Sequence, residues 1–381
     1  MKILILSEAC FNDNIFPMYK AMQGKGHDVT CLINLSSLKV ALFDIKQRIP
    51  IQGIINVYEY PELRIYRDYM DLSKMFFVNH QVDRKHPWRE LTSTISIIRF
   101  IKQGHFDIIH TDINFRRAKL LLYCFRKRIV YVQHDPFGHS GMEFSKWTKI
   151  YMKIAYKLLN KIVILNKFHY HDFCEINHID SQKVFVNKLG PLDCINLFKD
   201  PLVKERKNNI LFFGRIVQYK GIEYICEAMV EVHNIIPDAS LTIAGSGSFY
   251  FDISPYKKLP YIEIHNRFIE EKELARFLQE CSISICTYTD ATQSGGILTS
   301  FAMDKPVIAS DLDTLREMVT NGYDCILVPP RDSKALAQAI IRILTDNSLK
   351  KQLSENIAYE YKEGNKSWNS IVDKYLEIYQ T

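Results

Sequence analysis

The chain has 381 residues, of which 47% are hydrophobic and 24% charged, and its formal net charge is +6. This length exceeds that of one ordinary core, so two domains are expected, and the apolar content is sufficient to pack both. Because apolar runs of about 18 residues are absent and Met1–Leu6 is short, neither a spanning helix nor a signal peptide is predicted. Scattered cysteines without a Cys-x-x-Cys pair predict free thiols in a reducing compartment, and Cys281 and Cys286 are expected to be buried.

The charge is divided unevenly along the chain. Residues 1–195 contain 28 Lys and Arg against 18 Asp and Glu, whereas residues 196–381 contain 21 against 25. The first half is therefore expected to meet an anionic partner. Because no recognisable nucleic-acid-binding module accompanies this charge, nucleic acid is not the expected partner.

Apolar runs alternate with amphipathic segments throughout the chain. In the first half we expect a helix over Phe16–Gly24 and strands at Met1–Leu6, His27–Ile33, Ile108–Thr111, Ile129–Gln133, Lys161–Leu165 and Val184–Asn187. The alternation predicts an α/β fold with parallel, doubly wound sheets. The expected domains are residues 1–195 and 210–365, joined by a polar linker over 196–209 and followed by a C-terminal helix over 366–381.

A basic helix is predicted over Glu143–Lys161. At 100° per residue its lysines share an arc of about 120°; they are Lys146, Lys149, Lys153, Lys157 and Lys161. A stripe of lysines edged by apolar residues suits the surface of an anionic membrane. A solvated lysine face on a helix packed against the core explains the pattern equally well, so both interpretations stay open.

The segment 210–221 carries the clearest functional signal. An apolar strand ends at Gly214, and Arg215 and Lys220 follow before a helix begins near Gly221. Two cations at the carboxyl end of a strand, beside a helix N-terminus, suit an anionic ligand such as a diphosphate.

A second segment has the same chemistry. An apolar run over 282–288 predicts a strand, and 297–303 predicts a helix, so Ser294, Gly295 and Gly296 lie where that helix begins. Backbone N–H groups at such a position have no helical partner, and small side chains let an anion approach them.

In the first half, His134 and Asp135 follow the strand that ends at Gln133. Ligands of open α/β sheets bind at the carboxyl ends of strands, so both residues are candidate catalytic groups. A hydrogen-bonded structural histidine is the alternative interpretation of this strand-end pair.

In their order along the chain, these segments resemble the donor site of the GT-B glycosyltransferases, in particular the retaining group 1, or family 4, enzymes. The resemblance continues through the Glu-x-Val at Glu317 and through residues 322–330, which end in Val-Pro-Pro. Most members carry two glutamates eight positions apart, but here Ala291 and Thr299 occupy those places. Gln293-Ser294-Gly295 instead resembles a branch that lacks the paired glutamates.

The resemblance implies two Rossmann-like domains facing a central cleft, with the C-terminal helix returning to the first domain. Arg215 and Lys220 would neutralise the diphosphate of a nucleotide sugar, and His134 would contact the sugar, with Asp135 as its orienting partner or as a second polar contact. It further implies donor contacts from residues near the diphosphate, the base and the ribose, which are Gly214, Gly245, Arg267, Phe268, Gln293, Ser294, Gly295, Gly296 and Thr299. His139 and Glu143 are expected on the acceptor side.

The implied activity is retaining, metal-independent transfer of a hexosyl group from a UDP- or GDP-sugar to a glycan or lipid-linked acceptor. The expected setting is bacterial surface polysaccharide assembly, in the cytoplasm or on the inner face of the cell membrane. Asp311-Leu312-Asp313 follows a strand and is interpreted as structural rather than metal-binding. A nucleotide-sugar 2-epimerase-like GT-B enzyme and an inactive GT-B scaffold subunit remain as alternatives.

Overall fold

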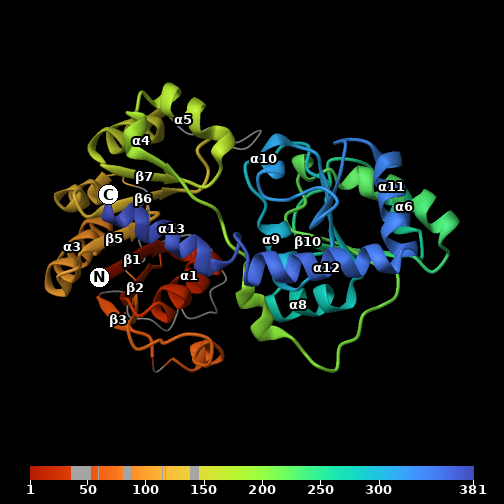
Figure 1. The fold of residues 1–381 in the computed structure, drawn as a ribbon, viewed down its shortest axis with the longest axis horizontal. Helices are drawn as coiled ribbons and strands as arrows, with labels where there is room; N and C mark the ends of the chain where they lie inside the picture. The colour runs from red at the N-terminus through yellow and green to blue at the C-terminus, as the bar shows by residue number, and fades with distance from the viewer. Residues whose placement is uncertain (36–52, 59, 80–86, 114, 116, 138–145) are drawn as a thin grey trace. The chain divides into compact units, whose positions relative to one another are not determined.

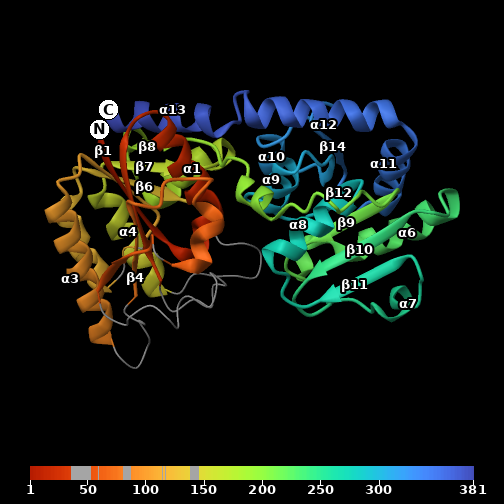
Figure 2. The same cartoon turned by 90° about the horizontal axis from the view of Figure 1, so that it is seen from below.

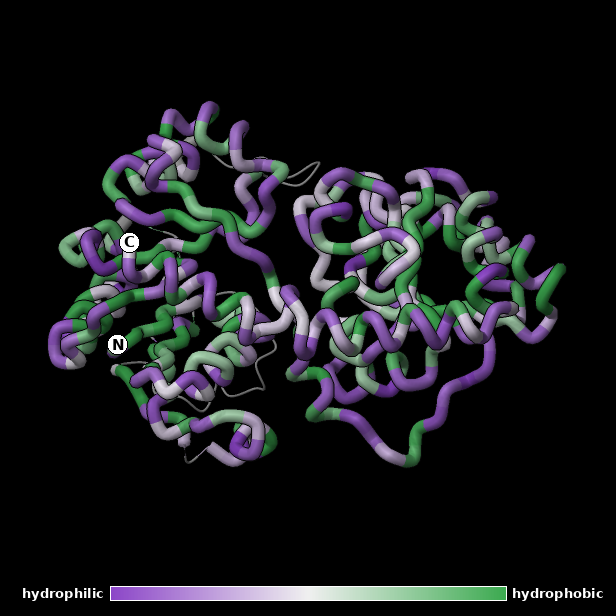
Figure 3. Tube along the Cα trace, in the orientation of Figure 1, coloured by the Kyte–Doolittle hydropathy of each residue, from purple (hydrophilic) through white to green (hydrophobic). Residues whose placement is uncertain are grey.

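The computed structural model describes residues 1–35, 53–58, 60–79, 87–113, 115, 117–137 and 146–381 (Figure 1). They form two compact units. The first consists of the described residues up to Leu189 together with Trp368–Thr381, and the second is Gly190–Ser367. In both units, hydrophobic segments (green) alternate along the chain with hydrophilic ones (purple) (Figure 3).

Among the described residues of the first unit, the sheet has eight strands. Their spatial order is β3 (Ile54–Asn56), β4 (Met75–Val78), β2 (Asp28–Asn34), β1 (Lys2–Glu8), β5 (Ile108–Thr111), β6 (Ile129–Gln133), β7 (Lys161–Ile164) and β8 (Val184–Val186). The pairs are parallel except for β3 with β4, which is antiparallel. The predicted parallel sheet is confirmed, and β5 and β6 have the predicted bounds. Chain order reverses at β1, which lies between β2 and β5.

Helical segments cover both faces of this sheet. They are η1 (Ala9–Phe11), α1 (Asn12–Gly24), η2 (Pro61–Tyr66), α3 (Pro87–Gly104), η3 (Arg117–Phe125), α4 (Lys146–Leu158), η4 (Lys167–His169), α5 (Tyr170–Asn177), η5 (Ser181–Lys183) and α13 (Trp368–Gln380). Helix α13 lies beside α1 although the two are far apart in sequence (Figures 1 and 2). Helix α1 begins four residues before the predicted start.

The prediction that Lys161 belongs to the lysine-rich helix is wrong. Helix α4 ends at Leu158, and Lys161 is the first residue of β7. Its ammonium donates to the carbonyl oxygens of Ile378, at 2.9 Å, and Tyr379, at 3.0 Å. The four-residue spacing of the lysines continues along the sequence after the helix has ended. The apolar run that contains Lys161 does not extend the helix, because it forms the strand between β6 and β8. Lys161 instead binds the unpaired carbonyls at the end of α13.

The second unit has a six-stranded parallel sheet. Its spatial order is β11 (Ile262–Asn266), β10 (Ser240–Gly245), β9 (Asn209–Phe213), β12 (Ile283–Cys286), β13 (Val307–Ser310) and β14 (Cys325–Val328). Around it lie η6 (Asp193–Phe198), η7 (Gln218–Lys220), α6 (Ile222–Ile235), α7 (Ser254–Lys257), α8 (Glu271–Glu280), α9 (Gly295–Ala302), α10 (Asp313–Arg316), α11 (Ser333–Thr345) and α12 (Asn347–Lys362). Chain order reverses at β9, which lies between β10 and β12 (Figure 2). Ligands of such sheets bind at the carboxyl ends of the strands at this reversal.

The division between the units falls at Leu189, ahead of the linker expected over 196–209. Segment η6 packs in the core of the second unit, where Ile195 is buried. Asn196 Nδ2 also donates to the carbonyl oxygen of Ala302 at 2.8 Å. The start of this stretch therefore packs on the second unit, whereas Leu202, further along, is 85% exposed. Cys281 and Cys286 are buried free thiols, as predicted.

Candidate functional site

The loop after β9 lies against the loop after β10 with almost no space between their backbones. Gly214 N–H donates to the carbonyl of Ala244 at 3.0 Å, and Ile216 N–H donates to that of Ser246 at 2.9 Å. A Cβ atom on Gly245 would lie 1.7 Å from the Gly214 carbonyl oxygen. Gly245, one of the predicted donor-site residues, is thus required by a close backbone approach.

The two predicted cations follow β9 directly. Arg215 is exposed, and its Nη2 donates to the Tyr219 hydroxyl at 3.0 Å. Lys220 is half-buried, with its Nζ 3.7 Å from the centre of the Tyr288 ring. The pKa of Lys220 is lowered to about 8, mainly by burial and to a smaller extent by the Arg215 charge, while Cys286 acts in the opposite direction.

Helix α9 begins at the small residues, as predicted. Ser294 is its N-cap residue, and its hydroxyl oxygen accepts a hydrogen bond from the Ile297 N–H at 3.1 Å. Gly295 is exposed and Gly296 is half-buried. The N–H groups of the first helical turn have no partner within the helix, and the positive end of the helix dipole lies there. This end of α9 is suited to an anion.

Contacts between the segments after β9 and β12 bring the cations and the helix end together. The Thr289 N–H donates to the Tyr219 carbonyl at 2.8 Å. Tyr288 then contacts Lys220 through its ring and Ser294 through its hydroxyl. Both segments follow strands next to the reversal of chain order. Residues about 75 positions apart in sequence therefore form one basic, amide-rich site.

Other predicted donor residues are bonded within the second unit. The guanidinium of Arg267 is exposed and donates to both carboxylate oxygens of Glu273, at 2.5 and 2.6 Å. Phe268 is 58% exposed. Arg316 bonds the carboxylates of Asp311 and Asp313. Both aspartates are thus paired with one arginine side chain.

The positions that replace the family's glutamates are both buried. Ala291 is 6% exposed, and its carbonyl accepts from the Thr314 hydroxyl at 2.6 Å. The Thr299 hydroxyl donates to the carbonyl of Gly295 at 2.8 Å, one turn earlier in α9. Its proton is therefore used within the helix, and only the oxygen lone pairs remain for a ligand. Gln293 is half-buried just before the helix.

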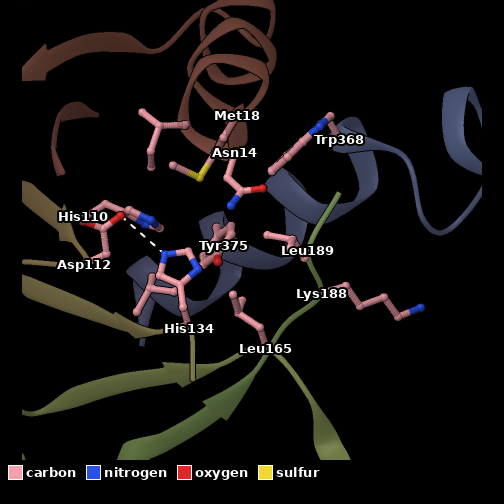
Figure 4. A pocket seen from close by; sticks show the side chains of 12 residues that line it. Asn14, Met18, His110, Asp112, His134, Leu165, Lys188, Leu189, Trp368 and Tyr375 are labelled. Atoms are coloured by element: carbon pink, nitrogen blue, oxygen red, sulfur yellow. Dashed lines mark hydrogen bonds and ion pairs between the residues drawn. The ribbon is translucent and has the colours of Figure 1, made fainter. Parts of the chain in front are cut away.

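In the first unit, His134 follows β6 and lies in a small pocket. Its ring stacks on Phe11 with a centroid distance of 3.9 Å and an interplanar angle of 8°. Its Nε2 lies 3.4 Å from Oδ2 of Asp112 (Figure 4). Helix α13 contributes Trp368 and Tyr375 to this pocket. The predicted position of His134 at a strand end is confirmed.

Asp112 is a site residue that the sequence reasoning missed. It follows β5 and is buried, and its carboxylate accepts hydrogen bonds from the Ser7 hydroxyl at 2.6 Å and the Glu8 N–H at 3.1 Å. Its position directly after the predicted strand 108–111 was the available signal. Asp135, the expected orienting residue, accepts from the Gln133 side chain through its carbonyl at 2.7 Å.

A polar cluster at the end of β1 adjoins Asp112. Glu8 is buried, and Asn34 donates to its two carboxylate oxygens at 3.1 and 3.0 Å. Lys119 forms an ion pair with the same carboxylate. The predicted acceptor residues His139 and Glu143 lie outside the described residues.

Comparisons with known proteins find similarity to glycosyltransferases. A family described as "Glycosyl transferases group 1" matches residues 207–346. An uncharacterized glycosyltransferase of Methanocaldococcus jannaschii is 23% identical over 86% of this chain and 84% of its own. The UDP-Gal:alpha-D-GlcNAc-diphosphoundecaprenol alpha-1,3-galactosyltransferase of Escherichia coli is 21% identical over 82% of this chain and 85% of its own.

Solved structures show the fold of the whole chain. Anabaena HepE in complex with UDP superposes with a TM-score of 0.68 at 15% identity, covering 99% of both chains. The expected GT-B fold is confirmed. Residues 207–346, which match the group 1 glycosyltransferase family, carry the loops after β9 and β12.

Proposed function

We propose that this glycosyltransferase takes its sugar from a nucleotide diphosphate sugar and that Arg215, Lys220 and the first turn of α9 bind the diphosphate. The observation that carries this proposal is the meeting of two cations and a helix N-terminus at the reversal of chain order in the second sheet. The Anabaena structure that superposes on the chain contains UDP, so a UDP-sugar is the first donor to test, with a GDP-sugar second.

These groups suit a leaving diphosphate. When the bond to the sugar breaks, negative charge grows on the diphosphate, and fixed charges and dipoles that already point at it stabilise the transition state. Lys220 is held by its surroundings rather than extended into solvent, so little reorganisation is needed. Arg215, which is exposed, brings a permanent charge to the same loop.

His134 is proposed to contact the transferred sugar. The ring is held between Phe11 and the Asp112 carboxylate, and an imidazole held in this way can exchange hydrogen bonds with a sugar hydroxyl. Retention of the sugar's configuration is proposed from the family resemblance and is tested by the anomeric proton signals of the product.

The proposed acceptor is a glycan or a lipid-linked sugar, used at an anionic membrane surface. The Escherichia coli relative is named for a diphosphoundecaprenol acceptor.

On α4, apolar side chains that are 39 to 41% exposed recur every four residues, at Ile150, Ile154 and Leu158. Each follows an exposed lysine, at Lys149, Lys153 and Lys157. Apolar residues beside lysines match the interfacial region of an anionic bilayer. Among the described residues, no helix is long and apolar enough to cross a membrane.

Thermal unfolding with UDP, GDP, ADP and dTDP tests the donor proposal. A ligand at about 100 times its dissociation constant adds about 2.7 kcal/mol to the free energy of unfolding. We expect stabilisation by UDP that Arg215→Ala abolishes. The control is Arg342→Ala, because Arg342 is also exposed but lies on α11. No stabilisation of the wild type by any of the four nucleotides would refute the proposal, as would equal loss in both variants.

A further inference from the structure

Tyr288 lies between the two halves of the diphosphate site. It follows β12 and is 2% exposed. On one side its ring lies 3.7 Å from the ammonium of Lys220. On the other side its hydroxyl accepts a hydrogen bond from the Ser294 hydroxyl at 3.1 Å.

The contact with the ring matters because Lys220 has a weakly compensated charge. Among the described residues, the charges that act on the Lys220 pKa are those of Cys286, which raises it, and Arg215, which lowers it, and neither is a carboxylate. The negative face of an aromatic ring attracts a cation, and this attraction is strongest where water is excluded. The Tyr288 ring can therefore hold the ammonium in place and leave its positive charge available to a ligand. A carboxylate in the same position would neutralise that charge.

The hydroxyl contact acts on the other half of the site. Ser294 uses its oxygen to cap α9 and its proton to bond Tyr288. A Cβ atom on Gly296 would lie 3.0 Å from the Tyr288 hydroxyl, so the first turn of α9 rests closely on this side chain. The position of the α9 amides is thus tied to the residue that holds Lys220.

We propose that Tyr288 is a positioning residue for sugar transfer, whose ring holds the Lys220 ammonium and whose hydroxyl holds the N-terminus of α9, so that both bind one diphosphate. This inference rests on the proposed nucleotide-sugar donor. Tyr288 itself touches neither the sugar nor the diphosphate in this assignment. Its effect on affinity passes through Lys220 and Ser294.

A double-mutant cycle on UDP affinity, measured by calorimetry, tests the role of the ring. Tyr288→Phe keeps the ring and Tyr288→Leu removes it, so the ratio of their affinities reports the ring alone. We expect this ratio to be about tenfold when Lys220 is present. In the Lys220→Met background the ratio should fall to about one, because the ring then has no cation to hold. Circular dichroism checks that each variant is folded.

The outcomes separate this inference from the proposed function. If the wild type binds UDP and Lys220→Met weakens it, but the Phe-to-Leu ratio is the same in both backgrounds, the ring acts only by packing and the inference is overturned. If the wild type binds no nucleoside diphosphate, the proposed function fails and the inference fails with it. Should Tyr288→Leu not fold, progressively fluorinated phenylalanines at this position keep the volume and remove the negative ring face. UDP affinity should then fall stepwise with fluorination, and an unchanged affinity would overturn the inference.

Discussion

Replacing Gly221 by alanine should destabilise the second unit through its left-handed conformation and one close backbone contact. Gly221 precedes α6 with φ at +63°, and a Cβ atom there would lie 2.2 Å from the Thr287 carbonyl oxygen. The left-handed conformation alone costs a residue with a side chain about 1–2 kcal/mol. Forcing backbone atoms apart adds about 1–3 kcal/mol. Gly221→Ala should therefore lower the free energy of unfolding by about 2–5 kcal/mol.

Gly322→Ala is the matched control. Gly322 also has a positive φ, +77°, but a Cβ atom there would meet nothing within 4 Å. It should show only the conformational cost of about 1–2 kcal/mol. In differential scanning calorimetry each kcal/mol corresponds to a shift of about 2–4 °C in the midpoint for a domain of this size. Equal shifts in the two variants would show that the approach of residue 221 to Thr287 contributes nothing.

Other predictions concern protonation and the membrane. Because the pKa of Lys220 is lowered to about 8, UDP affinity should fall above pH 8 as the ammonium loses its proton. Calorimetry from neutral pH upward checks this, with Lys220→Met, which lacks the ammonium, as the reference. Burial lowers the pKa of His110 from 6.5 to about 3, and its Nδ1 lies 2.7 Å from the Tyr379 hydroxyl. The unfolded chain therefore binds a proton at His110 that the folded chain does not. The free energy of unfolding should fall by up to about 1.4 kcal/mol per pH unit below about pH 6.5. Urea unfolding of His110→Asn should lack this contribution to the pH dependence. Lys153→Glu should reduce sedimentation with vesicles of anionic lipid at least about fivefold, since one lysine near such a surface contributes about 1 kcal/mol. The control is Lys351→Glu, because Lys351 lies on α12 and its side chain is 77% exposed; this variant should leave the sedimentation with vesicles unchanged. Equal losses of sedimentation in the two variants would argue against α4 as the docking face.

Local patterns were sufficient for much of the fold. A buried parallel strand is a short apolar run, and the bounds of β5 and β6 follow from such runs alone. The loop from Gly214 to Lys220 was also predictable, because the end of a strand, a glycine, two cations and the beginning of a helix lie within a few residues of one another. These features depend on neighbours in the chain and so are visible in the order of its residues.

The same reasoning failed where a local period continued by chance. Lys161 fits the four-residue spacing of the lysines before it, yet it belongs to β7 and binds the carbonyl oxygens at the end of α13. A helical period indicates which residues share a face only as long as the helix lasts. Its end is decided by what the following segment must pack against.

The pairings inside the site arise from contacts between distant segments. His134 lies beside Asp112 because β5 and β6 are neighbours in the sheet, and Tyr288 reaches Lys220 because β9 and β12 pair. Sequence alone shows that each of these residues follows a strand, but strand order is set by the packing of whole βα units and cannot be read from one of them. The chemistry available at each strand end is therefore local information, whereas the partner that sets its orientation and charge belongs to the folded sheet.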